Sequence, residues 1–168
     1  MHHIAIEWGG LRAVEPLHDE VLAHVLVETD VVEHYEQLAA HGKPFLLFHD
    51  GVLAGDGDIR SIGSGAAEFA FLIASPNAQG KGLGTRFATM IHAFAFAYLP
   101  IARMYAAVVP QNVASRRVFE KLGYVEDASE AARAFGDAGD VTLSIDRKTF
   151  AARNAAAIAE IRITGAAR

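Results

Sequence analysis

The stretch of sequence that decides the fold is NAQGKGLGT, residues 77–85, in which three glycines alternate with Lys81 and Leu83. It follows the apolar run EFAFLIASP at residues 68–76. It precedes RFATMIHAFAFAY at residues 86–98, whose apolar residues recur at helical spacing. A tight turn needs one glycine at most, because each additional glycine adds conformational freedom that folding must remove. The stretch therefore predicts a strand-to-helix corner whose backbone is approached closely by another group.

The composition of the whole chain limits the classes of protein to which it can belong. Its 168 residues are 52% hydrophobic and 21% charged, which is enough apolar material for one folded domain over residues 1–168. The net charge of −5 argues against a nucleic acid or an anionic membrane as the main partner. Cysteine is absent, which excludes disulfides and cysteine nucleophiles, and no apolar run has the length of a membrane span. We expect a cytoplasmic protein.

Hydrophobic periodicity in the first half of the chain predicts strands that surround a pair of helices. A short strand is expected at residues 3–8, and two helices between Val14 and His41. Three strands then follow as an antiparallel meander that ends near residue 74, with Asp50 and Gly51 as a hairpin turn.

The second half of the chain predicts helices that alternate with strands. A helix over residues 83–98 ends before Pro100, and the strand after it should lie parallel to the last strand of the meander. A helix from Asn112 to Gly123, two more strands and a C-terminal helix at about 149–163 complete the pattern. The fold class expected is mixed α/β (α+β), a single domain with a mostly antiparallel sheet of six to seven strands flanked by helices.

A glycine-rich corner at a helix N-terminus directs several free N–H groups toward one point, which favours a phosphate or pyrophosphate. A Walker P-loop does not fit, because Lys81 is followed by Gly82 in place of serine or threonine. A dinucleotide fingerprint does not fit either, because the spacing is G-x-G-x-G and Arg103 and Met104 stand near the expected acidic residue. A glycine-rich turn without a ligand remains an alternative.

Two segments of the chain resemble motifs of the GNAT superfamily of acyl-CoA-dependent N-acyltransferases. QGKGLG, from Gln79 to Gly84, is similar to the family's Q/R-x-x-G-x-G/A motif. NVASRRVFEKLGY, residues 112–124, resembles the N-x-x-S-x-x-x-Y-x-x-x-G-F/Y segment that follows the next strand in that family. The order of elements from residue 3 to residue 146 also resembles the family plan. The two motifs, in order and at an appropriate separation, favour this family over a ligand-free turn.

The resemblance implies a set of residues that contact coenzyme A. The backbone from Gln79 to Thr85 would bind the pyrophosphate with Lys81 beside it, and the preceding strand would present backbone groups to the pantetheine arm. The cofactor-binding residues predicted in this way are Leu72, Ile73, Ala74, Gln79, Gly80, Lys81, Gly82, Leu83, Gly84, Thr85, Asn112, Ser115, Arg116 and Phe119. Helix capping is the alternative role of Asn112 and Ser115, and a solvated helix face is that of Arg116.

The resemblance also implies where the chemistry occurs. Glu68 corresponds to the glutamate that some family members use as a general base, with a solvent-facing position on an amphipathic strand as the alternative. Phe119 departs from the family, because many members place there a tyrosine proposed to protonate the departing thiolate. Water, Ser115, Tyr105 or Tyr124 are the substitutes that the sequence offers.

The function expected is transfer of an acetyl group from acetyl-CoA to a primary amine, directly within a ternary complex and without a metal. A non-catalytic acyl-CoA-binding or regulatory module is the alternative that Phe119 suggests, and a nucleotide or other phosphate binder is a third class. The final strand and the terminal helix offer a surface for a homodimer.

Overall fold

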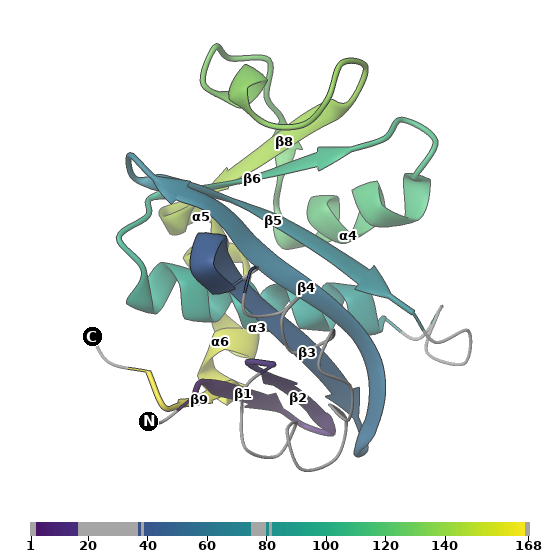
Figure 1. Ribbon diagram of the computed structural model, residues 1–168, viewed down its shortest axis with the longest axis vertical. Helices are drawn as coiled ribbons and strands as arrows, with labels where there is room; N and C mark the ends of the chain where they lie inside the picture. Colours follow the sequence, from purple (N-terminus) through teal and green to yellow (C-terminus); the bar gives the residue numbers. More distant parts are fainter. Residues whose placement is uncertain (1–2, 17–36, 38, 75–79, 81, 167–168) are drawn as a thin grey trace.

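The computed structural model describes residues 3–16, 37, 39–74, 80 and 82–166 of the chain. In these residues nine strands form one sheet, in the order β7-β8-β6-β5-β4-β3-β2-β1-β9 (Figure 1). The strands are β1 (Ala5–Trp8), β2 (Leu11–Val14), β3 (Gly42–His49), β4 (Val52–Gly63), β5 (Ala66–Ile73), β6 (Arg103–Val108), β7 (Val125–Glu126), β8 (Val141–Asp146) and β9 (Arg162–Thr164). The helices are α3 (Leu83–Tyr98), α4 (Val113–Leu122), η1 (Ala132–Ala134), α5 (Arg147–Arg153) and α6 (Ala155–Glu160).

The sheet is mixed and mostly antiparallel, as the sequence predicts. Among the described strands β5 and β6 form the one parallel pair, and α3 is the crossover between them. The turn between β3 and β4 falls at Asp50 and Gly51, whose φ angles of 49° and 80° suit a two-residue hairpin. The mixed α/β class and the parallel neighbours are therefore confirmed.

The predicted number of strands, six to seven, is too low. β2 follows β1 through the hairpin dipeptide Gly9–Gly10, and β9 pairs antiparallel with β1. Strands of three or four residues contain too few alternations for a periodicity to be recognised. The two helices predicted between Val14 and His41 fall largely outside the described residues, and Val14 itself ends β2.

The C-terminal helix predicted at about 149–163 is also wrong in its extent. Two short helices, α5 and α6, meet at Asn154, whose backbone φ of −115° and ψ of 21° interrupt the helical ladder. The chain then leaves the helical conformation after Glu160 to form β9. In the described residues no helix has both the length and the apolar character needed to cross a membrane.

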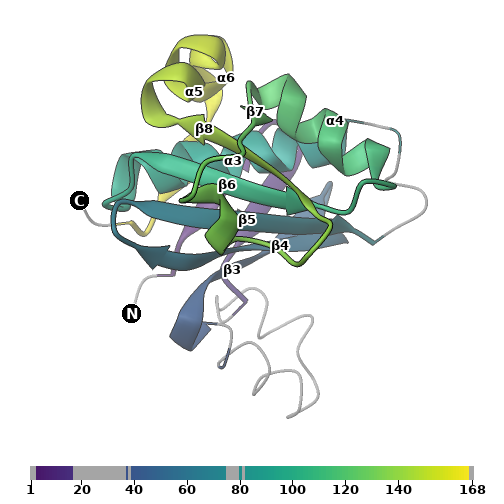
Figure 2. The ribbon, with the colours of Figure 1, turned by 90° about the horizontal axis from the view of Figure 1, so that it is seen from above.

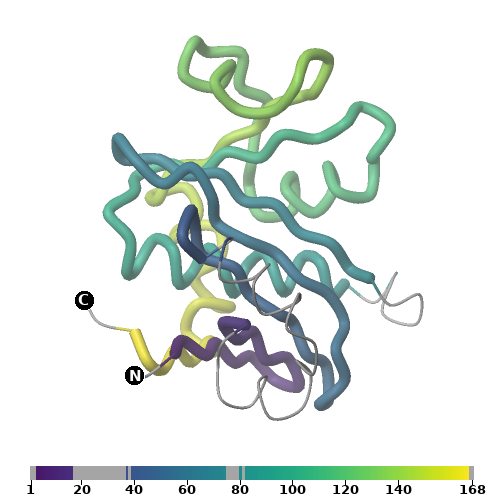
Figure 3. The backbone as a smooth tube through the Cα atoms, viewed as in Figure 1, coloured from purple at the N-terminus to yellow at the C-terminus, as the bar shows by residue number. Residues whose placement is uncertain are grey.

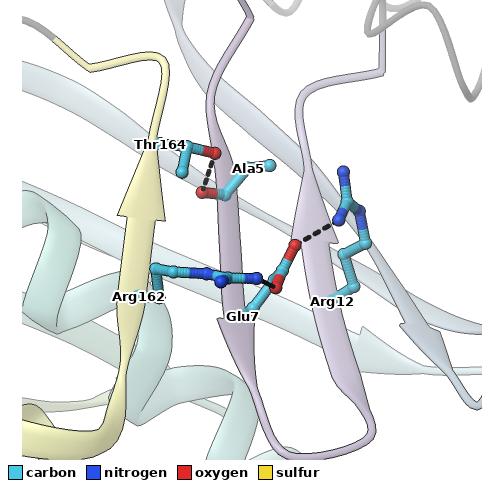
Figure 4. A network of polar contacts seen from close by, with 5 residues as sticks. All are labelled: Ala5, Glu7, Arg12, Arg162 and Thr164. Carbon is cyan, nitrogen blue, oxygen red and sulfur yellow. Dashed lines mark hydrogen bonds and ion pairs between the residues drawn. The ribbon is translucent and has the colours of Figure 1, made fainter.

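Polar contacts attach β9 to the edge of the sheet. The Glu7 carboxylate on β1 accepts hydrogen bonds from Arg12 on β2 and from Arg162 on β9 (Figure 4). Thr164 Oγ1 also donates to the Ala5 carbonyl at 3.4 Å. The two ends of the chain consequently lie close together (Figure 3). The strand expected to offer a dimer surface, β8, lies between β6 and β7 and is not a free edge.

The helices α3, α4, α5 and α6 cover one face of the sheet (Figure 2). The long helix α3 packs its apolar side, including Phe87, Met90 and Phe94, against that face, and all three side chains are fully buried. Along β5, Phe69 points into this core, whereas Glu68 lies on the opposite face. The sheet therefore separates a packed helical side from a side that carries the polar residues of β4, β5 and β6.

Candidate active site

The two parallel strands pair only briefly and then separate. The ladder between β5 and β6 joins Ala66 to Arg103, Ala67 to Met104 and Glu68 to Tyr105. Beyond Glu68 each strand continues without pairing to the other, and Figure 1 shows them diverging beside α4. This separation has the geometry in which another extended group adds beside a strand.

The antiparallel ladder between β4 and β5 decides which amides face this opening. The Ala74 N–H donates to the Ala54 carbonyl at 3.0 Å. Because such ladders alternate, the backbone groups of Leu72 and Ala74 are directed toward β4, and those of Phe71 and Ile73 toward the opening. Of the three strand residues predicted to present backbone groups, Ile73 therefore has the required orientation, whereas Leu72 and Ala74 do not. Leu72 instead contributes a side chain that is 61% exposed.

The glycine corner lies at the end of β5 and leads into α3. Gly80 and Gly82 have left-handed φ angles of 77° and 72°, and a Cβ atom built on either would meet nothing within 4 Å. Gly82 is the N-cap of α3 and has no side chain with which to cap it. Among the described residues, the first helical hydrogen bond runs from the Arg86 N–H to the Gly82 carbonyl at 3.1 Å, and the N–H groups of Leu83, Gly84 and Thr85 come before it in the helix.

These features favour an anion at the corner, since the glycines and the first-turn amides lie at the positive end of a 16-residue helix, and no described residue lies within 4 Å of a Cβ built on Gly80 or Gly82. The predicted ligands Gln79 and Lys81 lie outside the described residues. Gly84 has a different role, because its Cβ would lie 3.2 Å from the Phe71 ring and 3.4 Å from Val118. That glycine lets α3 approach β5 and α4 closely.

The residues predicted to bind coenzyme A near α4 are its N-cap, Asn112, and three residues within the helix. Asn112 is the N-cap, and its Oδ1 accepts from the Ser115 N–H at 3.1 Å, so the capping role is confirmed. The Arg116 guanidinium donates to Glu120 at 2.7 Å and lies 3.5 Å from Glu126. A phosphate would compete with these two carboxylates for Arg116, and the contact between Arg116 and coenzyme A stays a prediction.

Phe119 is a core residue in the described structure. It is 2% exposed and packs edge-on against Phe69 and Phe71, at ring centroid distances of 6.2 and 5.7 Å. These contacts join α4 to β5 on the helical face, at the residues of β5 that follow Glu68, where β5 and β6 separate. Packing accounts for the phenyl ring at this position.

Tyr124 is unsuited to replace the missing tyrosine acid. Its hydroxyl donates to His92 Nε2, while the His92 Nδ1–H donates to the Ala88 carbonyl at 2.6 Å. Burial raises the pKa of the Tyr124 phenol well above its ordinary value of 10.0, and burial lowers the pKa of His92 to about 4. A phenol with a raised pKa, already committed to a buried histidine, is a poor proton donor to a thiolate.

Glu68 lies at the last rung of the parallel ladder, where the opening begins. Partial burial raises the pKa of its carboxyl group above the ordinary value of 4.5. The nearby Arg60 cation lowers this pKa, whereas the carboxylates of Asp58, Asp140 and Asp137 raise it. Among the described residues Glu68 has neither a hydrogen-bond partner nor an ion pair. An unpartnered carboxylate with a raised pKa has the properties of a general base.

A loop over residues 127–140 covers β6 on the same side as Glu68. Phe135 stacks on the Tyr105 ring at 4.4 Å and 16°, and a Cβ on Gly136 would touch the Ala107 Cβ at 2.6 Å. A hollow of about 650 Å³ lies between this loop and strands β7 and β8. Asp137 and Asp140 of this loop are near enough to Glu68 to raise its pKa. The sequence analysis missed this covering of β6, because it depends on the contact between Tyr105 and Phe135.

Asp58 lies within β4 and pairs with Arg60. Among the described residues, no group of three histidine, aspartate or glutamate side chains is placed to hold a metal ion.

Comparison with protein families agrees with this geometry. The model of the acetyltransferase (GNAT) domain matches residues 11–125, which include β5, the glycine corner, α3, β6 and α4. The chain belongs to the GNAT acetyltransferase family. The predicted family and the predicted class, an acyl-CoA-dependent acetyltransferase, are thereby confirmed.

Solved structures share the fold at low sequence identity. RimJ from Mycobacterium smegmatis, in complex with CoA-disulfide, is 19% identical with a TM-score of 0.68, covering 96% of this chain and 99% of its own. Spermidine N-acetyltransferase from Vibrio cholerae, with CoA and spermine, is 20% identical with a TM-score of 0.65; the match covers 84% of this chain and 98% of that enzyme. The N-acetyltransferase PseH from Campylobacter jejuni, with acetyl coenzyme A, is 18% identical with a TM-score of 0.59; the match covers 86% of this chain and 99% of PseH.

Proposed function

We propose that this GNAT acetyltransferase moves an acetyl group from acetyl-CoA to a primary amine by direct transfer in a ternary complex. The observation that carries the proposal is the separation of β5 and β6 after Glu68, with the glycine corner at the far end of β5. Ile73 follows Glu68 by five residues, or about 17 Å of extended strand. This span is comparable to an extended pantetheine arm, so one molecule can reach from the corner to Glu68.

The residues available for acetyl-CoA divide by their chemistry. The amides of Leu83, Gly84 and Thr85 bind the pyrophosphate, together with the corner residues 79–82. Backbone groups on this edge of β5, those of Phe71 among them, pair with the amides of the pantetheine arm, in the manner of an added strand. Structures of three GNAT proteins with CoA, CoA-disulfide or acetyl coenzyme A support the choice of ligand. Acetyl-CoA supplies the acetyl group as a thioester at the Glu68 end.

Glu68 removes the proton that blocks attack by the amine. A lysine-like amine with a pKa near 10.4 is neutral in about 1 of 2,500 molecules at pH 7, a cost of about 4.6 kcal/mol. The ammonium proton goes to the Glu68 carboxylate, the neutral amine nitrogen bonds to the acetyl carbon as the carbon–sulfur bond breaks, and the second N–H proton passes to the departing thiolate, directly or through water. The chain has no cysteine, so no thiol acyl-enzyme precedes this step. The raised pKa of Glu68 supports its role as the acceptor of the proton.

The leaving thiolate does not require a strong acid. A thiol with a pKa near 8.5 leaves as thiolate close to neutral pH, so loss of the family's tyrosine costs less than loss of the base. Tyr105 lies opposite Glu68 in the parallel ladder, and among the described residues its hydroxyl has no hydrogen-bond partner. Tyr105 or water can therefore return a proton to sulfur.

The experiment is turnover of acetyl-CoA with a panel of primary amines, followed by thiol release, on the wild-type protein and on Glu68→Gln. We expect turnover with at least one amine and a loss of about 100-fold or more in kcat for Glu68→Gln. Tight binding of acetyl-CoA without thiol release for any amine would favour the non-catalytic module. A thermal shift with ATP or NAD in place of CoA would favour a different phosphate binder.

A further inference from the structure

We propose that Asp58 is a positioning residue for acetyl transfer: it holds the Arg60 guanidinium away from Glu68, so that the Glu68 carboxylate stays unpartnered and open to the amine proton. This inference rests on the proposed role of Glu68 as the base. It concerns three side chains on one face of β4 and β5, away from the helices.

The register of the sheet places Arg60 beside Glu68. The two residues are Cα partners in the antiparallel ladder between β4 and β5. Directly opposed residues point to the same face, with Cβ atoms about 5 Å apart. An arginine in that position would ordinarily pair with the carboxylate, since its planar fork matches a carboxylate in two parallel hydrogen bonds.

Arg60 instead pairs with Asp58, two residues earlier on its own strand. Arg60 Nε donates to Asp58 Oδ2 at 2.8 Å, and Nη2 donates to Oδ1 at 2.5 Å. The Asp58 side chain is 17% exposed and that of Arg60 is 48% exposed, so the aspartate is the more firmly enclosed partner. Both oxygens of Asp58 are occupied, and Glu68 makes no ion pair with any described residue.

The partner that Arg60 chooses matters, because pairing with Glu68 would lower the pKa of that carboxyl group and block its oxygens. An arginine in direct contact lowers the pKa of a carboxyl group by about 1 to 3 units and occupies the oxygens that must receive a proton. With Arg60 bound to Asp58, burial outweighs the lowering by the nearby Arg60 cation, and the pKa of Glu68 stays above its ordinary value.

The described elements packed around Glu68 carry the following charged or titratable groups, which affect its pKa or are placed to pair with it. From β4 these are Arg60 and Asp58, and from the loop of residues 127–140 they are Asp137 and Asp140. From β6, Tyr105 is the ladder partner of Glu68. Arg103, two residues earlier on β6, is bonded to Ser144 at 3.0 Å and lies 3.9 Å from Asp146. Among these groups, Arg60 is the cation that would pair with Glu68 if it lost its partner Asp58.

A structural pair on the sheet surface is the competing explanation. Partly exposed ion pairs contribute little to stability. With Arg60 left in place, Asp58→Asn would then lower the pKa of Glu68 only by the small amount that the Asp58 charge raises it, and kcat would stay close to that of the wild type. The two explanations therefore differ in a readout that stability does not affect.

The test measures the pKa of Glu68 by NMR titration of ¹³C-labelled glutamate carboxyl groups, with Glu68→Gln to assign the resonance. We expect Asp58→Asn to lower this pKa by about one unit or more. The acidic limb of the pH profile of kcat/KM, for an amine found in the panel, should move down equally. At fixed pH kcat should fall about tenfold while the KM for acetyl-CoA stays within twofold.

Two further variants make the result specific. Asp58→Asn with Arg60→Gln should return the pKa of Glu68 to within about 0.5 units of, or above, the wild-type value, because no arginine is then left to pair. Asp50→Asn removes a carboxylate from the hairpin at the other end of β4 and should leave the pKa and the profile unchanged. A Glu68 pKa that falls by less than about 0.5 units in Asp58→Asn, or a double variant that behaves like the single one, would overturn the proposal.

The same set separates this proposal from the proposed function. Wild-type turnover by Glu68→Gln would refute the role of Glu68 as the base. A large loss in Glu68→Gln together with an unmoved titration in Asp58→Asn would refute the positioning role alone. If Asp58→Asn does not fold, the NMR pKa of Glu68 in the double variant decides: a value more than about one unit below wild type would overturn the proposal.

Discussion

The buried pair of His92 and Tyr124 predicts how the stability of the protein depends on pH. His92 is fully buried among aromatic rings, with Phe69 and Phe150 at centroid distances of 5.0 and 5.7 Å. Burial lowers its pKa from 6.5 to about 4, against a smaller opposing contribution from the hydrogen bond to Ala88. The folded protein therefore keeps a neutral imidazole in a pH range where the unfolded chain binds a proton.

The sign and size of the effect follow from this difference. A group whose pKa is lowered on folding contributes stability fully above pH 6.5 and loses it as the pH falls toward 4. Within that window the unfolded state binds one more proton, so the free energy of unfolding falls by about 1.4 kcal/mol per pH unit. Between pH 7.5 and 4.5 the loss assigned to His92 is about 2 to 3 kcal/mol.

The assay is urea unfolding at a series of pH values, for the wild-type protein and for a double variant, His92→Phe with Tyr124→Phe. Removing both partners avoids leaving one buried polar group without its hydrogen bond. Other groups, including Glu68 with its raised pKa, titrate in both proteins and cancel in the difference. The wild type should lose about 2 to 3 kcal/mol more than the variant on acidification. Parallel curves for the two proteins would refute the reasoning.

Three other substitutions test separate parts of the structure. Phe119→Tyr should leave kcat within about tenfold, measured by thiol release, whereas a gain of several orders of magnitude would show that the wild type lacks a needed acid. Arg147→Ala should lower the free energy of unfolding in urea by about 2 kcal/mol, because the guanidinium donates to the carbonyls of Phe96 and Ile101; an unchanged midpoint would contradict this. Asn112→Ala should cost about 1 kcal/mol as a lost helix cap, and unchanged affinity for acetyl-CoA in calorimetry would limit this residue to capping.

Local chemistry made much of the fold predictable from sequence. Asp50 and Gly51 form the hairpin expected of that dipeptide, because both adopt positive φ angles. Glu68 and Phe69 lie on opposite faces of β5, as the period of a strand requires. The helix α3 begins directly after Gly82, so the glycine corner also falls where the sequence places it.

The features that the sequence analysis missed depend on contacts between distant residues. β9 exists because Arg162 and Ile163 find partners on β1, about 155 residues earlier in the chain. The covering of β6 by the loop of residues 127–140 depends on the stack of Phe135 on Tyr105. The pairing of Arg60 with Asp58 in preference to Glu68 is a choice between two carboxylates within reach, and no periodicity encodes it.

The claim on which the account depends is that the glycine corner binds the pyrophosphate of acetyl-CoA. Gly82 and Gly51 offer a matched pair of sites, with φ angles of 72° and 80° and with open space around the position of a Cβ. A glutamate at either position meets the same backbone strain, but at residue 82 its charge stands at the proposed anion site.

The most direct measurement is therefore the dissociation constant of acetyl-CoA, by isothermal titration calorimetry, for the wild type, Gly82→Glu and Gly51→Glu. We expect Gly82→Glu to weaken binding by about 30-fold or more, equivalent to about 2 kcal/mol, and Gly51→Glu to stay within twofold of the wild type. A folded Gly82→Glu protein that binds acetyl-CoA as tightly as the wild type would contradict the account.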